Sequence, residues 1–247
     1  VLGKGSNLLV GDKGLHGIVV SLSSNLSGEC FRQIVQTKEL NSRVYLYAGA
    51  GVALTRLLRF TIQNGLSGLE FTAGIPGSFG GAVIMNAGSY GKEIKDVLDS
   101  VRIIDRDGCP ADIPAKDISF QYRGTAIHGK AIAGAVLRLR KGDKEKIEKT
   151  VQENLLRKKK SQPLNKPSAG SIFKNPGSTR AWELIDSVGM RGASVGGACV
   201  SPLHANFIVN NGKATAGDVI SLIRQIGSRV EKDTGTTLEL EVKIVGK

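Results

Sequence analysis

The sequence of 247 residues is long enough for one large or two modest domains, and two domains are expected. Its 40% apolar and 23% charged residues are ordinary globular proportions, which argue against a disordered chain. The net charge of +12 suits an anionic partner, whether nucleic acid, a membrane surface or a phosphorylated small molecule, and does not choose among them.

The cysteines and the hydropathy pattern indicate the cellular compartment in which the protein is expected. Cys30, Cys109 and Cys199 are far apart and form no CxxC pair, so neither a disulfide framework nor a zinc site is indicated. A reducing cytoplasm is therefore expected. No apolar run approaches the ~18 residues that a membrane span needs. Because the chain opens at Val1 directly on a glycine-rich run, with no leading strand, we interpret it as cut at its start.

The first half of the chain is rich in strand signals and in glycine. Apolar side chains cover much of the circumference of residues 55–64, and Gly65 follows where a glycine would end a helix, so a short buried helix is predicted there. The sequence of Arg106, Asp107 and Gly108 has turn chemistry. Enrichment in β-branched and apolar residues predicts strands at residues 16–23, 44–48, 101–105 and 130–139.

Helical patterns dominate the second half. Ile147, Val151 and Leu155 recur every four residues, which predicts a solvent-facing helix over residues 143–160. A Pro/Asn/Ser-rich stretch at 161–170 follows and is the best candidate for a domain boundary. Beyond it we expect helices at 179–188 and at 215–230, the latter capped by Thr215 and Asp218, and a half-buried strand at 238–245. The pattern is that of an α+β or mixed α/β protein.

Two glycine-rich runs are candidates for ligand binding. In LGKGSNLLV, residues 2–10, two glycines precede an apolar strand and allow backbone N–H groups to point at an anion, although such spacing more often makes only a tight turn. The run GIPGSFGGAVIMNAGSYG, residues 74–91, forms either successive turns or a side-chain-free wall against a large cofactor, and we favour the wall. Neither run has P-loop or Rossmann spacing.

Three polar segments complete the set of candidates. They are SFQYR at residues 119–123, PSAGSIFKNP at residues 167–176, and the pair Glu239 and Glu241, which share one face of the expected terminal strand. Each has an ordinary alternative, because a serine in a loop is usually a turn residue and paired surface carboxylates are usually solvated.

In this order and spacing, the five segments resemble the UDP-N-acetylenolpyruvoylglucosamine reductase (MurB) family along essentially the whole chain, and residues 74–91 and 167–176 are the most specific. The resemblance implies an α+β protein in which a PCMH-type FAD-binding domain, here without its first lobe, precedes an α+β substrate domain. The connection between Arg123 and Ser171 is too short for the substrate-capping insertion of the longer class, so the short class is indicated.

The resemblance also implies domains and an activity. Residues 1–141 would form the partial FAD-binding domain, 142–161 a connecting helix and linker, and 162–247 the UDP-sugar domain. The implied reaction is the NADPH-driven reduction of UDP-N-acetylglucosamine enolpyruvate to UDP-N-acetylmuramate in peptidoglycan synthesis, with non-covalent FAD as cofactor. We expect a cytoplasmic monomer with no metal and no nucleic-acid or membrane partner.

Residue roles follow from the same resemblance. Arg123 matches the position that stabilises the enolate, Ser171 matches the proton donor, and Glu241 matches the third catalytic position. Substrate binding is implied for Tyr122, Lys174 and Asn175, with a plain surface lysine an equal alternative for Lys174. His204 reads as a packed core histidine. The FAD contacts implied are Gly3, Gly5, Ser6, Asn7, Leu8, Gly74, Ile75, Pro76, Gly77, Ser78, Gly80, Gly81, Ala82, Asn86 and Gly88.

Two other functions fit parts of the sequence. Another FAD oxidase of the same superfamily would act on an alcohol or lactone, but no His or Cys stands in a glycine-rich loop to link the flavin, and residues 167–176 weigh against it. A nucleic-acid-binding protein would suit the charge, but aromatic residues make up only 5% and the basic residues are dispersed apart from residues 157–160.

Overall fold

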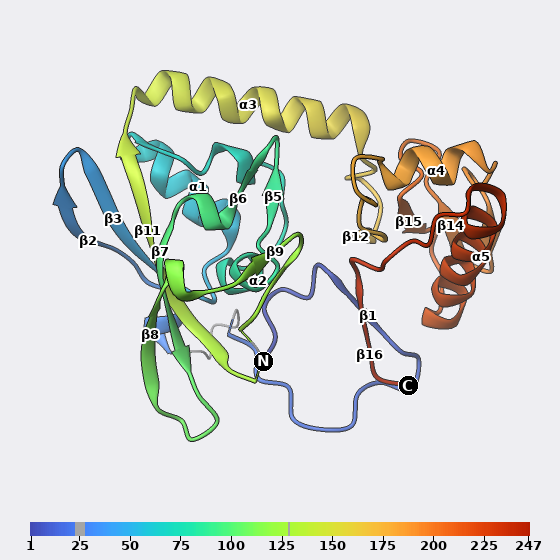
Figure 1. The fold of residues 1–247 in the computed structure, drawn as a ribbon, viewed down its shortest axis with the longest axis horizontal. Coiled ribbons are helices and arrows are strands. Elements are labelled where there is room, and N and C mark those ends of the chain that lie inside the picture. The colour runs from blue at the N-terminus through green and yellow to red at the C-terminus, as the bar shows by residue number, and fades with distance from the viewer. Residues whose placement is uncertain (23–27, 128) are drawn as a thin grey trace. The chain divides into compact units, whose positions relative to one another are not determined.

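A computed structural model describes residues 1–22, 28–127 and 129–247, which Figure 1 traces. The described chain divides into two compact units. The first holds Val1–Gly5 and Val19–Leu156, and the second holds Ser6–Ile18 and Arg157–Lys247. This division differs from the expected bounds at two places: it falls inside a long helix, and it assigns a short segment near the N-terminus to the second unit.

The first unit is built on an antiparallel sheet in the order β2-β3-β11-β7-β8, with β4 paired to β11. These strands are β2 (Ile34–Leu40), β3 (Arg43–Gly49), β4 (Leu66–Ser67), β7 (Leu98–Ile104), β8 (Pro110–Pro114) and β11 (Ala131–Lys141). Its helices are α1 (Leu54–Gln63), α2 (Phe79–Ile84) and most of α3 (Lys144–Ser161). Two small ladders pair β5 (Gly88–Ser89) with β6 (Lys92–Glu93) and β9 (Phe120–Gln121) with β10 (Gly124–Thr125). Short 3-10 turns lie at Glu29–Phe31, Glu70–Thr72, Ile94–Asp96 and Ala115–Asp117.

One face of this sheet carries the core of the first unit. In β3, Val44, Leu46 and Ala48 are buried, whereas Tyr45 and Tyr47 alternate with them on the other face and are half-buried. This is the period of two that a strand imposes. The helices α1 and α2 lie against the apolar face and share one hydrophobic cluster with it (Figure 1). The sheet is therefore the base on which α2 and its glycine-rich flanks are held.

The predicted helix near residue 55 is confirmed as α1, but only one side of it is buried. Leu57 and Leu58 pack into the core, whereas Arg56 and Arg59 are exposed. Gly65 follows the helix with φ 61°, the left-handed conformation that ends many helices. The expected helix buried around its circumference is thus an amphipathic helix on the surface of the sheet.

The predicted helix over residues 143–160 is confirmed as α3, with a change in its buried stripe. Ile147 and Val151 are buried as the four-residue period requires, but Leu155 is 42% exposed. Asn154 is buried in its place, and its Nδ2 donates to the Glu70 carbonyl at 3.1 Å. Asn154, and not Leu155, therefore faces the rest of the first unit, because the Glu70 carbonyl lies there as an acceptor.

The second unit has a four-stranded antiparallel sheet in the order β12-β15-β14-β13, packed with two helices. Its strands are β12 (Ser168–Ser171), β13 (Ser194–Val195), β14 (Ala198–Val200) and β15 (Phe207–Asn210), and its helices are α4 (Ala181–Ser187) and α5 (Ala216–Thr234). Apart from this sheet, β1 (Leu8–Val10) pairs in parallel with β16 (Lys243–Val245), which joins the two ends of the chain within this unit.

Helix α5 confirms its predicted cap. Thr215 Oγ accepts from the Asp218 backbone N–H, and the Asp218 carboxylate accepts in return from the N–H of Thr215, both at 3.0 Å. The backbone N–H of Thr215 and that of Gly197 hold the pKa of Asp218 below its ordinary value. Gly235, with φ 70°, ends the helix. Start and stop signals that act within one turn are thus reliable here.

Two predicted strands are wrong in whole or part. Residues 16–20 form no strand, Ile18 is 94% exposed, and only an isolated bridge joins Ser21 to Leu2; residue 23 lies outside the described residues. The terminal strand is limited to β16, preceded by a single bridge between Leu240 and Phe173. β-Branched residues predicted the first strand and alternating side chains predicted the second. Both predictions failed in part because these segments have few backbone hydrogen-bond partners among the described residues.

A pair of glycine substitutions tests the packing of α2. A Cβ on Gly80 would lie 2.7 Å from the Ala50 Cβ, so Gly80→Ala is expected to destabilise the protein by roughly 1–3 kcal/mol through overpacking. Nothing lies within 4 Å of a Cβ on Gly227 inside α5, so Gly227→Ala is expected to stabilise by about 0.5–1 kcal/mol. Urea unfolding measures both, and an unchanged or raised stability of Gly80→Ala would contradict this account.

Candidate active site

The run 74–91 combines glycine turns with the short helix α2. Gly74 and Gly77 have φ of 72° and 133°, which side-chain-bearing residues rarely adopt. Ser78 then caps α2, its Oγ accepting from the Gly81 N–H at 3.4 Å. Gly80 is buried against Ala50, the residue that follows β3. The run is thus neither a simple series of turns nor a wall that is open along its whole length.

The first amides of α2 are already satisfied by the protein. Phe79 N donates to the Val52 carbonyl at 2.7 Å, and Gly80 N donates to the Ala50 carbonyl at 2.9 Å. Helix N-terminal N–H groups serve an anion only when they have no other acceptor. Backbone contacts to a phosphate from this run would therefore fall to the residues that precede α2.

Burial separates the expected FAD contacts of this run into two groups. Gly74, Ile75, Pro76, Gly77, Gly81 and Gly88 are at least partly exposed, whereas Ser78, Gly80, Ala82 and Asn86 are buried. The buried group lies on the protein side of the run. The buried residues pack against the rest of the first unit and hold the run in its conformation. The partly exposed residues are the ones that a ligand can contact.

The opening run meets the second run through Gly3. A Cβ at Gly3 would collide with the Ser78 Oγ, so the backbone of the opening run passes directly beside the cap of α2. Gly5 has φ 67°. The remaining expected contacts of this run, Ser6, Asn7 and Leu8, belong to the second unit, where Asn7 Nδ2 donates to the Glu241 carbonyl at 3.0 Å.

Arg123 is held by three different groups of the first unit. Its Nη2 donates to the Gly88 carbonyl at 3.1 Å, its Nη1 lies 3.9 Å from a Glu93 carboxylate oxygen, and its guanidinium carbon lies 4.8 Å from the centre of the Tyr122 ring. The side chain is only 19% exposed. A guanidinium fixed in this way is suited to bind a carboxylate or to stabilise negative charge that develops next to it.

Ser171 and Glu241 are brought close together in the second unit. Ser171 ends β12, where Gly170 has φ 80° and the pairing with β15 shifts register. The Glu241 N–H donates to the carbonyl of Ile172, the residue after Ser171, at 2.8 Å. A backbone hydrogen bond therefore places two of the three expected catalytic residues side by side, while Arg123 belongs to the first unit.

Lys174 and Asn175, expected to bind substrate, have partners within the second unit. Lys174 Nζ forms an ion pair with the Glu239 carboxylate, and its N–H donates to the Glu239 carbonyl at 2.8 Å. Because the Glu239 side chain is 73% exposed, this ion pair contributes little stability. Asn175 Oδ1 accepts from the Ala181 N–H at 3.0 Å, at the start of α4. Part of what these residues do is structural.

Asn206 is a residue of this site that sequence reasoning missed. It is 4% exposed; its Oδ1 accepts from the Phe173 N–H at 2.9 Å and its Nδ2 donates to the Phe173 carbonyl at 2.8 Å. The carbonyl of Asn206 also accepts from the Ile172 N–H. The available signal was an amide directly before the apolar residues of β15. Asn206 thus fixes the chain just after Ser171.

His204 supports Asn206 and confirms the core reading of this histidine. Its Nδ1 accepts from the Asn206 N–H at 3.3 Å, and its ring packs edge-on against Phe207 and Trp182. Burial, and then the nearby Arg191 charge, lower the pKa of His204. The imidazole is accordingly neutral at pH 7, which suits a nitrogen that accepts a hydrogen bond.

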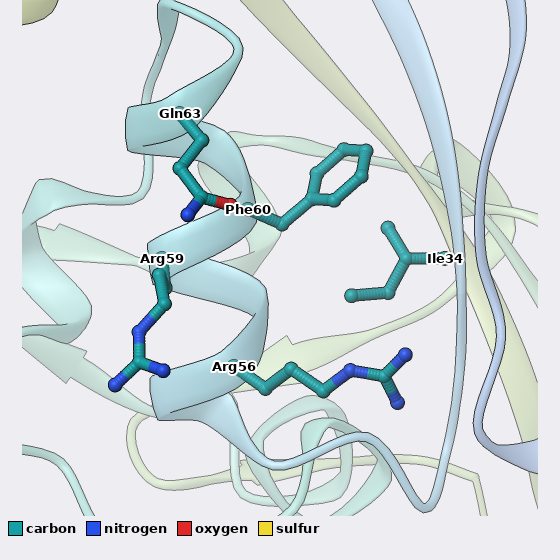
Figure 2. Close-up of a pocket in the computed structure, with 5 residues that line it drawn as sticks. All are labelled: Ile34, Arg56, Arg59, Phe60 and Gln63. Carbon is teal, nitrogen blue, oxygen red and sulfur yellow. The ribbon is translucent and has the colours of Figure 1, made fainter.

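Two surface hollows lie beside α1. Figure 2 shows the first, which contains none of the expected site residues, with the Arg56 side chain extended along it and Ile34 opposite Phe60; its lining is Ile34, Arg56, Arg59, Phe60 and Gln63. The second lies between α1 and α3 and includes Gly74, one of the expected FAD contacts. Neither hollow therefore brings the expected site residues together.

The described residues contain neither a membrane-spanning helix nor a metal-binding cluster. None of their helices combines the length and the apolar character that crossing a bilayer demands. Within the same residues, His, Cys, Asp and Glu side chains nowhere gather in threes in a way that would hold a metal ion.

Comparison with known proteins gives consistent matches along the chain. Residues 1–111 match the FAD binding domain family, and residues 162–245 match the family described as UDP-N-acetylenolpyruvoylglucosamine reductase, C-terminal domain. The UDP-N-acetylenolpyruvoylglucosamine reductase of Orientia tsutsugamushi (strain Ikeda) is 43% identical over 100% of this chain and 80% of its own. That of Heliobacterium modesticaldum is 45% identical, over 100% of this chain and 76% of its own.

A solved structure agrees with these matches. The crystal structure of UDP-N-acetylenolpyruvylglucosamine reductase (MurB) from Thermus caldophilus superposes with a TM-score of 0.82 at 38% identity, covering 99% of this chain and 84% of its own. The similarity therefore extends over both units and not over a single domain.

Asn206→Ala tests the support of the segment after Ser171. The change leaves the N–H and the carbonyl of Phe173 without their side-chain partner, and each buried unsatisfied group costs roughly 1–3 kcal/mol. Chemical denaturation should show this loss. The matched control is Asn211→Ala, which removes an exposed contact to Lys166 and should change stability by less than about 0.5 kcal/mol. Equal effects of the two variants would contradict the role of Asn206.

Proposed function

This chain belongs to the UDP-N-acetylenolpyruvoylglucosamine reductase family, and we propose that it reduces UDP-N-acetylglucosamine enolpyruvate to UDP-N-acetylmuramate in peptidoglycan synthesis. The observation that carries the proposal is the identity to these reductases over the entire chain and at least three quarters of theirs. NADPH is the proposed reductant. The carbon–carbon double bond of the enol ether gains a hydride at one carbon and a proton at the other.

Arg123 is proposed to stabilise the charge that develops in this reaction. When hydride adds to the terminal carbon of the enolpyruvyl group, negative charge moves toward the carboxylate oxygens. A planar cation with two parallel N–H donors matches a carboxylate and gains strength as the charge grows. The support for this role is the fixed, largely buried guanidinium beside Gly88 and Glu93.

Ser171 is proposed to give the proton to the carbon next to the carboxylate, with Glu241 as its neighbour. A serine hydroxyl is a weak acid, so a proton transfer from it needs a nearby group that can share or replace the proton. The backbone bond between Glu241 and Ile172 supports the assignment, because it keeps a carboxylate-bearing residue beside Ser171. Lys174 and Asn175 are proposed to contact the substrate, Lys174 through its charged ammonium and Asn175 through its side-chain amide.

FAD fits the first unit, and when bound it supplies the carrier of hydride between NADPH and the substrate. The backbone of Gly3 passes beside Ser78 without room for a side chain, and Gly74 and Gly77 hold backbone conformations that keep side chains away. Residues that would hold the cofactor are the partly exposed Gly74, Ile75, Pro76, Gly77, Gly81 and Gly88. The buried residues of α2 would keep this surface in shape.

The central test is Ser171→Ala. The two half-reactions are followed separately by flavin absorbance: bleaching by NADPH, then recovery of colour on addition of the enolpyruvyl substrate. The variant is expected to keep the first rate and to lose roughly 10²–10⁴ in the second, the range of general-acid contributions.

The matched control for this test is Ser187→Ala, which removes an exposed hydroxyl of the same unit that donates only to the Leu184 carbonyl. It should leave both rates unchanged. Equal loss of both half-reactions in Ser171→Ala would refute the assigned role, and absence of both in the unsubstituted protein would refute the function.

We further propose that the protein acts in the cytoplasm as a monomer, without nucleic-acid or membrane partners. The scattered cysteines and the soluble nucleotide substrate support this. Light scattering at micromolar concentration should give the mass of one chain, and the mass should not change on addition of DNA at 150 mM salt. A dimer mass or a stable DNA complex would overturn these two points and leave the reductase proposal standing.

A further inference from the structure

A small hairpin of the first unit surrounds Arg123. Strands β5 and β6 pair Gly88 with Glu93, so the carbonyl of one and the carboxylate of the other face the same guanidinium. A Cβ on Gly88 would lie 3.2 Å from Arg123 Nη1 and 2.8 Å from the Glu93 Cγ. The close approach of the three residues thus depends on a hairpin position that has no side chain.

A buried amide fixes the Glu93 carboxylate. Asn86 is 0% exposed, and its Nδ2 donates to Glu93 Oε2 at 2.9 Å while its Oδ1 accepts from the Lys95 N–H at 3.1 Å. The Lys95 ammonium lies 2.8 Å from the same Oε2. Two donors therefore engage one carboxylate oxygen, and the other oxygen, Oε1, is the one directed at Arg123.

Backbone strain is concentrated in the same cluster. Among the described residues, five non-glycine residues have positive φ, and three of them are Asn86 (40°), Tyr90 (55°) and Arg123 (58°). The Tyr90 hydroxyl donates to the Asn154 carbonyl at 2.7 Å, which ties the hairpin turn to α3. Such conformations cost free energy and persist only where the surroundings enforce them, most often at functional sites.

The charges of the cluster balance one another. Arg123 and Lys95 are cations, and Glu93 and Asp96 are anions. The Asp96 carboxylate accepts from the Glu93 N–H at 2.8 Å and also acts on the Lys95 charge. Without Glu93 the cluster would carry one positive charge, and the Arg123 guanidinium would lose its anionic partner.

We propose that Glu93 is a positioning residue for Arg123: held by Asn86 and Lys95, it orients the guanidinium for the carboxylate of the substrate. The inference rests on the proposed function, because it assigns Arg123 to the enolpyruvyl carboxylate. Glu93 acts through Arg123 and not on the substrate. Its removal should therefore affect only the half-reaction in which the enolpyruvyl group is reduced.

The test is Glu93→Gln, which keeps the shape of the side chain and removes its charge. A misplaced catalytic group commonly costs up to about 100-fold, so reduction of the enolpyruvyl substrate should slow by roughly 10- to 100-fold, with flavin reduction by NADPH unchanged. Glu93→Asp keeps the charge and should recover part of the loss. The control is Asp112→Asn, which breaks the exposed pair with Arg102 in the same unit and should leave both rates unchanged.

A second readout follows Arg123 without turnover. The ¹⁵Nε relaxation of the Arg123 side chain should report a rigid guanidinium in the unsubstituted protein and in Asp112→Asn, and a mobile one in Glu93→Gln at unchanged melting temperature. Should Glu93→Gln fail to fold, the same measurement on Glu93→Asp decides, since the shorter carboxylate should leave Arg123 partly mobile.

The outcomes separate the two proposals. An unsubstituted protein that does not reduce the enolpyruvyl substrate removes the proposed function. An active protein whose Glu93→Gln variant keeps both rates, slows both equally, or keeps a rigid Arg123 overturns the positioning role of Glu93 and leaves the function in place.

Discussion

The two hydrogen bonds at the start of α2 are the constraint on which the first unit's site depends. Buried backbone groups need partners, and here the carbonyls of Val52 and Ala50, in the segment that follows β3, accept from Phe79 and Gly80. This requires the helix to approach Ala50 so closely that only glycine fits at residue 80. The turns before α2 and the hairpin after it are thereby fixed to the sheet. Glycine at the buried position 80 is needed so that α2 can pack against the sheet. Only the glycines at exposed positions of this run are available to a ligand.

Each unit uses one buried asparagine to hold its site. Asn86 bonds a carboxylate and a backbone N–H, and Asn206 bonds both backbone groups of Phe173. An amide serves because it donates and accepts at once, so it can join two segments without leaving a buried charge. The sequence indicated neither role: Asn86 was expected to contact FAD, and Asn206 was not singled out, since an asparagine usually indicates a turn. Their roles depend on partners 7 to 33 residues away in the chain.

The sequence predicted features that depend on near neighbours. Helix α5 was found because Thr215, Asp218 and the apolar period all lie within its own turns, and α3 was found by its four-residue repeat. Strand β2 was missed because its exposed, polar IVQTKEL lacks a hydrophobic face, and its pairing with β3 is what makes it a strand. The placement of Glu241 beside Ser171 likewise depends on a backbone bond across the unit, which no local pattern encodes.

The two units hold their proposed catalytic side chains by different means. The difference follows from the number of rotatable bonds in each side chain. Arginine has four rotatable bonds, so a fixed backbone alone leaves the guanidinium free to take many positions. The first unit accordingly surrounds Arg123 with a carbonyl, a carboxylate and an aromatic ring. Serine has a single rotatable bond to its hydroxyl oxygen, so fixing the backbone nearly fixes the oxygen. The second unit needs only strand pairing and the bonds of Asn206 and Glu241 to the two residues after Ser171, and the backbone itself does the positioning.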